Sequence, residues 1–195
     1  MTENEHLSGP PDAPEAAPPE RTNVIGATIN WLRDLMLSVV IAVLVILFVY
    51  QPVKVEGTSM MPALEDQERI FINKFIYRFG IGDIQRGDTV VFWYPNDPSK
   101  SYIKRVIGLP GDEIEVMDGT VSVNGKTLTE EYVPPAYRDS VSVPRVVVPG
   151  GHYYVLGDHR SSSNDSRHWG PVHRRHIYGK AVFVYWPLDK VGLLR

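Results

Sequence analysis

The chain has 195 residues, a formal net charge of −3 and no cysteine, and its length suits one domain of ordinary size with a tail and an anchor. The absence of cysteine excludes disulfides, thiolate metal ligands and a cysteine nucleophile. The small charge and the scattered basic residues argue against a nucleic-acid partner, because such proteins usually carry a basic patch.

The first segment of the chain is rich in proline and acidic residues, and it has almost no large apolar side chain before residue 24. A segment of this composition buries too little apolar surface to offset the entropy that it would lose on ordering. We therefore predict a disordered tail over residues 1–30.

An uncharged apolar run from Leu35 to Tyr50 follows this tail. A helix over residues 31–52 would be long enough to cross a bilayer at about 1.5 Å per residue. Trp31 and Tyr50 stand where interfacial aromatic anchors are found. A buried core helix is disfavoured because the run is apolar on every face. A cleaved signal peptide is disfavoured because Gln51-Pro52-Val53 is not a small-residue cleavage site.

After Pro52 the sequence changes to short β-like runs with turn residues between them. Asn124-Gly125 is a strong signal for a two-residue hairpin. We predict an all-β domain of antiparallel hairpins over residues 53–195, with a small cap or insertion at about 116–148. The predicted strands cover residues 69–74, 89–93, 101–107, 113–116, 120–123, 153–156 and 181–186.

Ser59 is the candidate nucleophile, and it lies shortly after the apolar run in Gly57-Thr58-Ser59-Met60-Met61-Pro62. A serine hydroxyl needs a general base, which is usually a histidine backed by an acid or an unprotonated lysine. His159 follows Asp158 and could act as such a histidine. The elbow pattern G-x-S-x-G is absent around Ser59, however, so nothing in the spacing supports this pairing.

Three histidines near the C-terminus, His168, His173 and His176, could bind a metal ion. They lack the H-E-x-x-H spacing of metalloprotease sites, so loop or surface histidines are the commoner explanation. We expect no metal and no other cofactor.

Lys104 is the second candidate base. On a strand it would share one face with Tyr102 and Val106. Apolar neighbours disfavour the charged ammonium form, which lowers the pKa of a lysine and makes the neutral amine available near neutral pH. A solvent-facing strand lysine is the alternative, and Lys104 alone would not decide against it.

Four motifs occur in order from the apolar run to about Trp186, and together they resemble bacterial type I signal peptidase, the membrane-bound leader peptidase. They are Gly57–Pro62, Arg86–Phe92, Tyr102–Asp112 and Gly157–Arg167. The resemblance implies an all-β core of antiparallel sheets with a smaller β cap, and a membrane-bound serine endopeptidase that removes signal peptides from exported preproteins.

The resemblance also implies a role for each matching residue. Ser59 would be the nucleophile and Lys104 the general base, while Ser163 would hydrogen-bond to the lysine and orient it. The supporting polar residues would be Asp158, Asp165, Arg167 and Arg105, with Asp165 and Arg167 as an ion pair. The shallow pockets for the small side chains of an Ala-x-Ala sequence would involve Val55, Gly57, Met60, Leu64, Tyr102 and Ile103.

One position departs from some members of that family, which carry a serine hydroxyl in the oxyanion hole two residues before the nucleophile. Gly57 occupies that position here and has no side-chain donor. Either backbone N–H groups are enough to stabilise the oxyanion or Thr58 contributes to it. We expect the backbone to be enough, with the N–H of Ser59 above all.

The resemblance implies secretory preproteins, the export machinery and membrane lipid as partners, without nucleic acid. It implies a single-pass protein of the bacterial cytoplasmic membrane with its N-terminus in the cytoplasm and its catalytic domain outside. The charges that flank the apolar run are too few to set this orientation. Two alternatives remain: a serine-lysine peptidase with a narrow set of substrates, and a catalytically dead β-domain that only binds.

Overall fold

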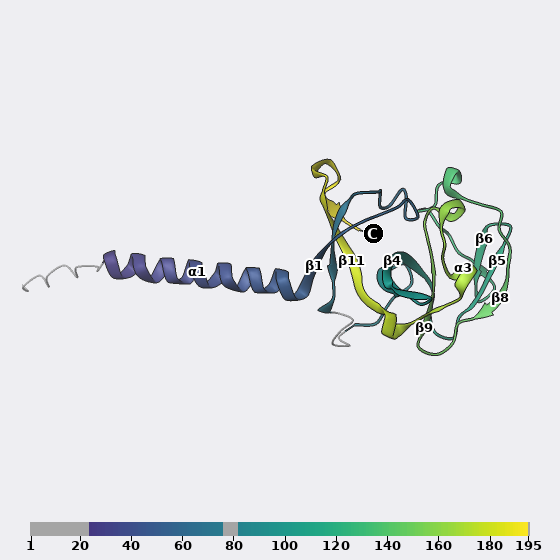
Figure 1. The fold of residues 1–195 in the computed structure, drawn as a ribbon, viewed down its shortest axis with the longest axis horizontal. Coiled ribbons are helices and arrows are strands. Elements are labelled where there is room, and N and C mark those ends of the chain that lie inside the picture. The colour runs from purple at the N-terminus through teal and green to yellow at the C-terminus, as the bar shows by residue number, and fades with distance from the viewer. Residues whose placement is uncertain (1–23, 76–81, 195) are drawn as a thin grey trace, which may run out of the picture. The chain divides into compact units, whose positions relative to one another are not determined.

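The structure is a computed structural model that describes residues 24–75 and 82–194. Helix α1 runs from Val24 to Val49, and strand β1 (Tyr50–Lys54) follows it directly (Figure 1). The expected limits of the membrane helix, 31–52, are therefore wrong at both ends. Residues 24–30, expected in the disordered tail, are helical, whereas residues 1–23 lie outside the described part.

The side chains of α1 support a membrane anchor rather than a core helix. Over Ile25–Val45 the helix is long and apolar enough to cross a bilayer, and none of that stretch is buried. The helix ends near Pro52, whose backbone nitrogen carries no hydrogen and so cannot donate the bond that a continuing helix would need. Residues 50–54 pair instead with 69–73 as an antiparallel ladder.

Two antiparallel sheets form the β domain, as predicted. The larger sheet has the order β1-β2-β11-β3-β4-β9-β10, with β12 paired to β11. Its strands are β1, β2 (Arg69–Asn73), β3 (Thr89–Tyr94), β4 (Asp97–Gly108), β9 (His152–Leu156), β10 (Val172–His173), β11 (Ile177–Trp186) and β12 (Gly192–Leu193).

The smaller sheet, which we call the cap, has the order β7-β6-β5-β8. Its strands are β5 (Glu113–Met117), β6 (Thr120–Val123), β7 (Lys126–Thr127) and β8 (Val143–Val147). The turn between β6 and β7 is Asn124-Gly125, and both residues have positive φ (52° and 75°), as a tight hairpin of this kind requires. The cap begins at 113 rather than 116, since β5 belongs to it.

The cap is fixed to the larger sheet through a shared apolar core. Ile107 of β4 and Tyr154 of β9 pack in one cluster with Ile114 and Val121 of the cap. All four side chains are almost wholly buried, and burial at this level contributes about 1.5–3 kcal/mol for each aliphatic side chain. The long segment between β7 and β8 carries the short helix η1 (Pro135–Tyr137).

Two further short helices, η2 (Arg160–Ser162) and α3 (Ser166–Trp169), follow β9 (Figure 1). They form the segment 157–169, whose polar residues the sequence pattern singled out. Two remaining turns, η3 (Arg174–His176) and η4 (Leu188–Lys190), flank β11.

Candidate active site

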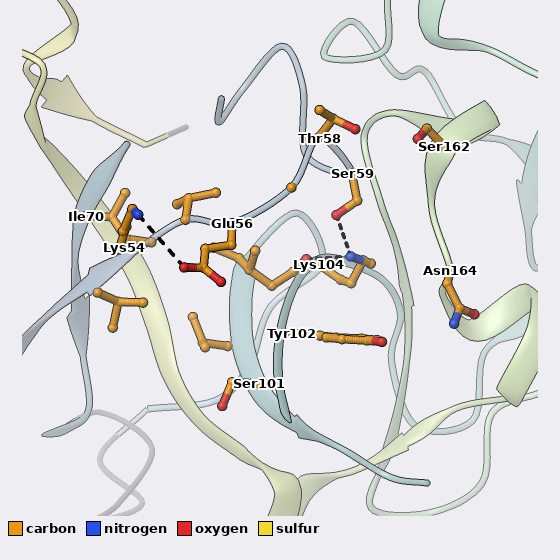
Figure 2. A pocket seen from close by; sticks show the side chains of 15 residues that line it. Lys54, Glu56, Thr58, Ser59, Ile70, Ser101, Tyr102, Lys104, Ser162 and Asn164 are labelled. Carbon is orange, nitrogen blue, oxygen red and sulfur yellow. Dashed lines mark hydrogen bonds and ion pairs between the residues drawn. The ribbon is translucent and has the colours of Figure 1, made fainter. Parts of the chain in front are cut away.

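Ser59 and Lys104 meet at the centre of the site, although they are far apart in the chain. Lys104 Nζ donates a 2.7 Å hydrogen bond to Ser59 Oγ and a 3.0 Å bond to the carbonyl of Ile103 (Figure 2). Lys104 comes from β4, whereas Ser59 lies in the turn after β1. The hydroxyl and the amine are thus already within proton-transfer distance.

Lys104 is 4% exposed, and no carboxylate lies within salt-bridge distance of it in the described residues. Burial lowers the pKa of Lys104 from 10.5 to about 8, against the more distant pull of Asp165 and Asp158. The ring of Tyr102, two residues before it on the same strand face, lies 5.4 Å from Nζ, as the strand alternation predicted. At pH 7 the neutral amine is therefore a minority form of about one tenth, far more than an ordinary lysine provides.

A pocket of about 480 Å³ opens beside this pair. Its walls are two chain segments, 53–59 and 101–104, with apolar side chains at its base and Ser162 and Asn164 across from Ser59 (Figure 2). Four of the expected substrate-contacting residues line it: Val55, Gly57, Tyr102 and Ile103.

Met60 and Leu64 are not among the residues that line this pocket, and their contact with a substrate stays a prediction. They are 1% and 0% exposed, and they pack with Ile70 and Ile72 in the core beneath the nucleophile turn. Their side chains hold the turn from below, because apolar side chains this large gain most from complete burial.

Both walls of the pocket contain strand edges that pair with no further strand within residues 24–75 and 82–194. Strand β1 ends the order of its sheet and pairs only with β2. Strand β4 pairs with β3 along its length, but with β9 only over Arg105–Gly108, which leaves Ser101–Lys104 open on that side. An extended peptide could therefore pair with the backbone of either wall.

Gly57 shapes the turn that presents Ser59. Its φ is +93°, a conformation that residues with a Cβ rarely adopt, and its N–H donates a 2.8 Å bond to Asp66 Oδ1. The backbone N–H of Ser59 donates to no acceptor in the described part of the chain. It is thus available to a group that enters the pocket.

The predicted supporting residues form buried ion pairs behind Lys104. Arg105 Nε and Nη2 donate to the two oxygens of Asp158 at 2.9 and 2.6 Å. The predicted pair of Asp165 and Arg167 is present, with bonds of 2.8 and 2.9 Å. Asp165 is 0% exposed, and the guanidinium of Arg167, opposed by burial, holds the pKa of that carboxyl below its usual value.

Sequence reasoning missed two further pairs that connect this segment to the cap connection, the chain between β7 and β8. Arg160 bonds to both carboxylate oxygens of Glu130, and Arg167 Nη1 donates a 2.6 Å bond to Asp139. No spacing in the sequence relates Glu130 or Asp139 to their partners. The structure buries both arginines, and a buried cation needs such a partner, but the sequence does not show that they are buried.

The predicted hydrogen bond between Ser163 and Lys104 is not formed. Ser163 Oγ is buried without a hydrogen-bond partner among the described residues. Ser163 nevertheless lies next to the nucleophile turn: a Cβ on Gly157 would fall 2.2 Å from Ser163 Oγ and 2.5 Å from the carbonyl oxygen of Ser59. Only glycine at 157 permits this close approach, which places the Ser163 hydroxyl near the backbone of Ser59.

The histidine alternatives do not fit this geometry. His159 Nδ1 contacts the carbonyl of Thr58 at 3.2 Å, whereas Ser59 Oγ is bonded by Lys104. His173 and His176 have ring centroids 6.4 Å apart, and within residues 24–75 and 82–194 no group of three acidic or histidine side chains could hold a metal ion.

Comparison with known proteins gives one consistent result. Residues 28–186 match the family described as "Signal peptidase, peptidase S26". The chain is 40% identical to the probable signal peptidase I-2 of Synechocystis sp. over 91% of its own length and 80% of that protein. It is 35% identical to a signal peptidase I of Bacillus licheniformis over 87% and 95% of the two chains.

The chain also resembles a signal peptidase I from Enterococcus faecalis whose crystal structure is known. The two sequences are 33% identical over 51% of this chain and 97% of that one, with a TM-score of 0.46. The family match spans most of the chain and includes Ser59, Lys104 and the segment 157–167. The protein therefore belongs to the signal peptidase family, peptidase S26.

Proposed function

We propose that this protein is a serine endopeptidase that removes signal peptides from exported preproteins, with Ser59 as nucleophile and Lys104 as general base. The observation that carries the proposal is the 2.7 Å bond between Lys104 Nζ and Ser59 Oγ at the wall of an open pocket. Family membership over residues 28–186 supports the substrate class.

The pocket fits an extended chain with small side chains. Ile70, Val91 and Ile103 are among its lining residues, and they offer apolar contact to short side chains such as alanine. The residues before the scissile bond would pair with the open edge at Ser101–Lys104 and with the segment 53–57 opposite. This supports cleavage after an Ala-x-Ala sequence.

The chemistry begins when neutral Lys104 takes the proton of Ser59 and Oγ attacks the carbonyl carbon of the scissile bond. The Ser59 N–H stabilises the oxyanion that forms, since Gly57 offers no side-chain donor. Protonated Lys104 then gives its proton to the leaving amine. Lys104 next activates the water that releases the acyl group from Ser59.

The anchor α1 supports a membrane location. A single pass, with the N-terminus in the cytoplasm and the β domain outside, would bring the site to the compartment into which preproteins emerge. The export machinery and membrane lipid are the partners that this location implies.

The test is cleavage of a synthetic peptide with an Ala-x-Ala signal sequence by the wild type and by Ser59→Ala, with mass spectrometry of the products. Cleavage after the second alanine by the wild type alone is the expected result. A serine-lysine peptidase of narrow range would instead cut few of a mixed set of precursors. A binding module would cut none and would resist labelling of Ser59 by an acylating inhibitor.

A further inference from the structure

Each peptide unit on either side of Ser59 Cα is bonded to the same residue, His159. The ring Nδ1–H of His159 donates to the carbonyl of Thr58 at 3.2 Å. The backbone N–H of His159 donates to the carbonyl of Ser59 at 3.1 Å. Because a carbonyl oxygen only accepts, Nδ1 carries the proton in this contact.

The bond to Thr58 concerns catalysis because of peptide geometry. The carbonyl of Thr58 and the N–H of Ser59 belong to one planar unit and point in opposite directions. Two donors hold that oxygen, the His159 ring and, within the turn itself, the N–H of Met61 at 3.1 Å. Holding the oxygen on one side aims the hydrogen to the other. The N–H of Ser59 has no acceptor among the described residues. Because Gly57 has no side-chain hydroxyl, the oxyanion depends on this N–H as its donor.

The same bond also strengthens the donor. A peptide whose carbonyl accepts a hydrogen bond is polarised, so its N–H becomes a better donor. Transition-state stabilisation of this type depends on donors that are oriented before the charge develops. His159 thus acts on the reaction without touching the substrate.

The cap connection holds the histidine in turn. The ring of Tyr137, in η1, meets the His159 ring edge to face, with centroids 4.7 Å apart and an angle of 86°. The next residue, Arg160, is fixed by Glu130 from the same connection. The His159 ring is therefore positioned from both its own segment and the cap connection.

We propose that His159, held by Tyr137, is a positioning residue that orients the Thr58–Ser59 peptide so that its N–H serves as the oxyanion donor. This inference rests on the proposed acyl-transfer function. It places one part of the catalytic apparatus in the connection between β7 and β8, outside the Ser-Lys pair.

The main experiment compares His159→Ala, His159→Asn and His159→Gln. The amide nitrogen of asparagine can occupy the place of Nδ1, whereas that of glutamine reaches the place of Nε2, so only asparagine should restore the bond to Thr58. We expect kcat to fall roughly tenfold to a hundredfold in His159→Ala and His159→Gln, below the loss seen when a donor itself is removed. KM should stay near the wild-type value, and His159→Asn should recover most of kcat.

Two additional variants separate positioning from general damage. Tyr137→Ala removes the ring that meets His159 and should lower kcat by about two- to tenfold. His168→Ala is the matched control, because that histidine is exposed and lies in the same segment, and among the described residues no side-chain hydrogen bond joins it to the nucleophile turn. The midpoint of the pH–rate profile, set by Lys104, should not move in any of them.

A second readout does not depend on a signal peptide: the rate at which an acylating inhibitor modifies Ser59. A slower rate in His159→Ala and His159→Gln, with recovery in His159→Asn, supports the inference. Equal rates in the wild type and the three His159 variants, or asparagine and glutamine variants that behave alike, would overturn it. A wild type that is acylated but cleaves no signal peptide would overturn the proposed substrate alone.

Discussion

Lys104 and Arg105 are neighbours on β4 and are buried to a similar extent, but only Arg105 has a carboxylate partner among the described residues. Arg105 is 2% exposed and is held by both oxygens of Asp158. Lys104 is 4% exposed, and in the part of the chain that the structure describes its Nζ bonds to one hydroxyl and one carbonyl and to no carboxylate. Because strand side chains alternate, the two cations face different surroundings one residue apart.

The difference teaches how one strand can support both structure and chemistry. A buried cation with a bidentate carboxylate keeps its charge and fixes the segment 157–167 to the sheet. A buried cation without such a partner tends to lose its proton, and only that one can act as a base. Moving a carboxylate from one face to the other would abolish the distinction.

The largest effect should follow from Lys104→Met, which keeps the length of the side chain but removes the amine. We expect kcat to fall by about 10⁴-fold or more, as when one member of a catalytic unit is removed. Lys104→Arg should be as inactive, because a guanidinium stays protonated. Peptide cleavage measures this effect, and circular dichroism should find the β domain intact; appreciable activity in either variant would rule out Lys104 as the base.

The matched change on the other face, Arg105→Met, should instead damage stability. It leaves Asp158 buried without its partner, which costs roughly 3–5 kcal/mol in the free energy of unfolding. Urea denaturation measures this loss. Arg105→Met with unchanged stability would mean that the two faces of β4 do not differ as described.

The pH dependence of cleavage comes next. Since burial lowers the pKa of Lys104 to about 8, the neutral base is the minority form below that pH. The rate should fall about tenfold for each unit of pH below 7, and it should level off above about pH 9. A pH–rate profile of kcat/KM measures it, and a flat profile between pH 6 and 8 would argue against a neutral lysine base.

The same lowered pKa affects stability. The unfolded chain binds a proton at Lys104 up to about pH 10.5, whereas the folded one releases it near pH 8, so stability contributed by this site rises with pH between these values. Lys104→Met should therefore be more stable than the wild type by roughly 1–3 kcal/mol at pH 7. The gain should vanish by about pH 11. Thermal unfolding of both proteins at pH 7 and pH 11 measures it, and equal stability at pH 7 would contradict the prediction.

The smallest effect is expected at an exposed pair. Arg145 Nη1 lies 3.0 Å from Glu113 on the cap, and the two side chains are 57% and 37% exposed. Arg145→Met should change the free energy of unfolding by about 0–1 kcal/mol. A loss comparable with that of Arg105→Met would show that burial is not what separates the two arginines.

The sequence predicted the all-β fold and most strands because alternating apolar runs and turn residues are local signals. The limits of α1 were less accessible, since Tyr50–Lys54 reads equally well as the end of an apolar helix and as a strand. Pairing with residues 69–73 decided the matter, and pairing is not visible in a local pattern.

Residues of the site could be predicted only where they belong to a recognisable sequence motif. Ser59, Lys104 and the pair Asp165–Arg167 were identified in that way, whereas Glu130 and Asp139 have no sequence signal because their partners come from a distant segment. Met60 and Leu64 were assigned to the pocket through the resemblance alone. Their packing in the core with Ile70 and Ile72 has no local sequence signal, because it depends on contacts with distant strands.

The pocket between two open strand edges has a consequence for the proteins that this enzyme would process. Recognition through backbone hydrogen bonds does not depend on which side chains the substrate carries, so most positions of a leader sequence are free to drift. Only the few residues whose side chains enter the apolar base are constrained. One enzyme could then serve a large and changing set of genes, and new exported proteins could arise without any change in the enzyme.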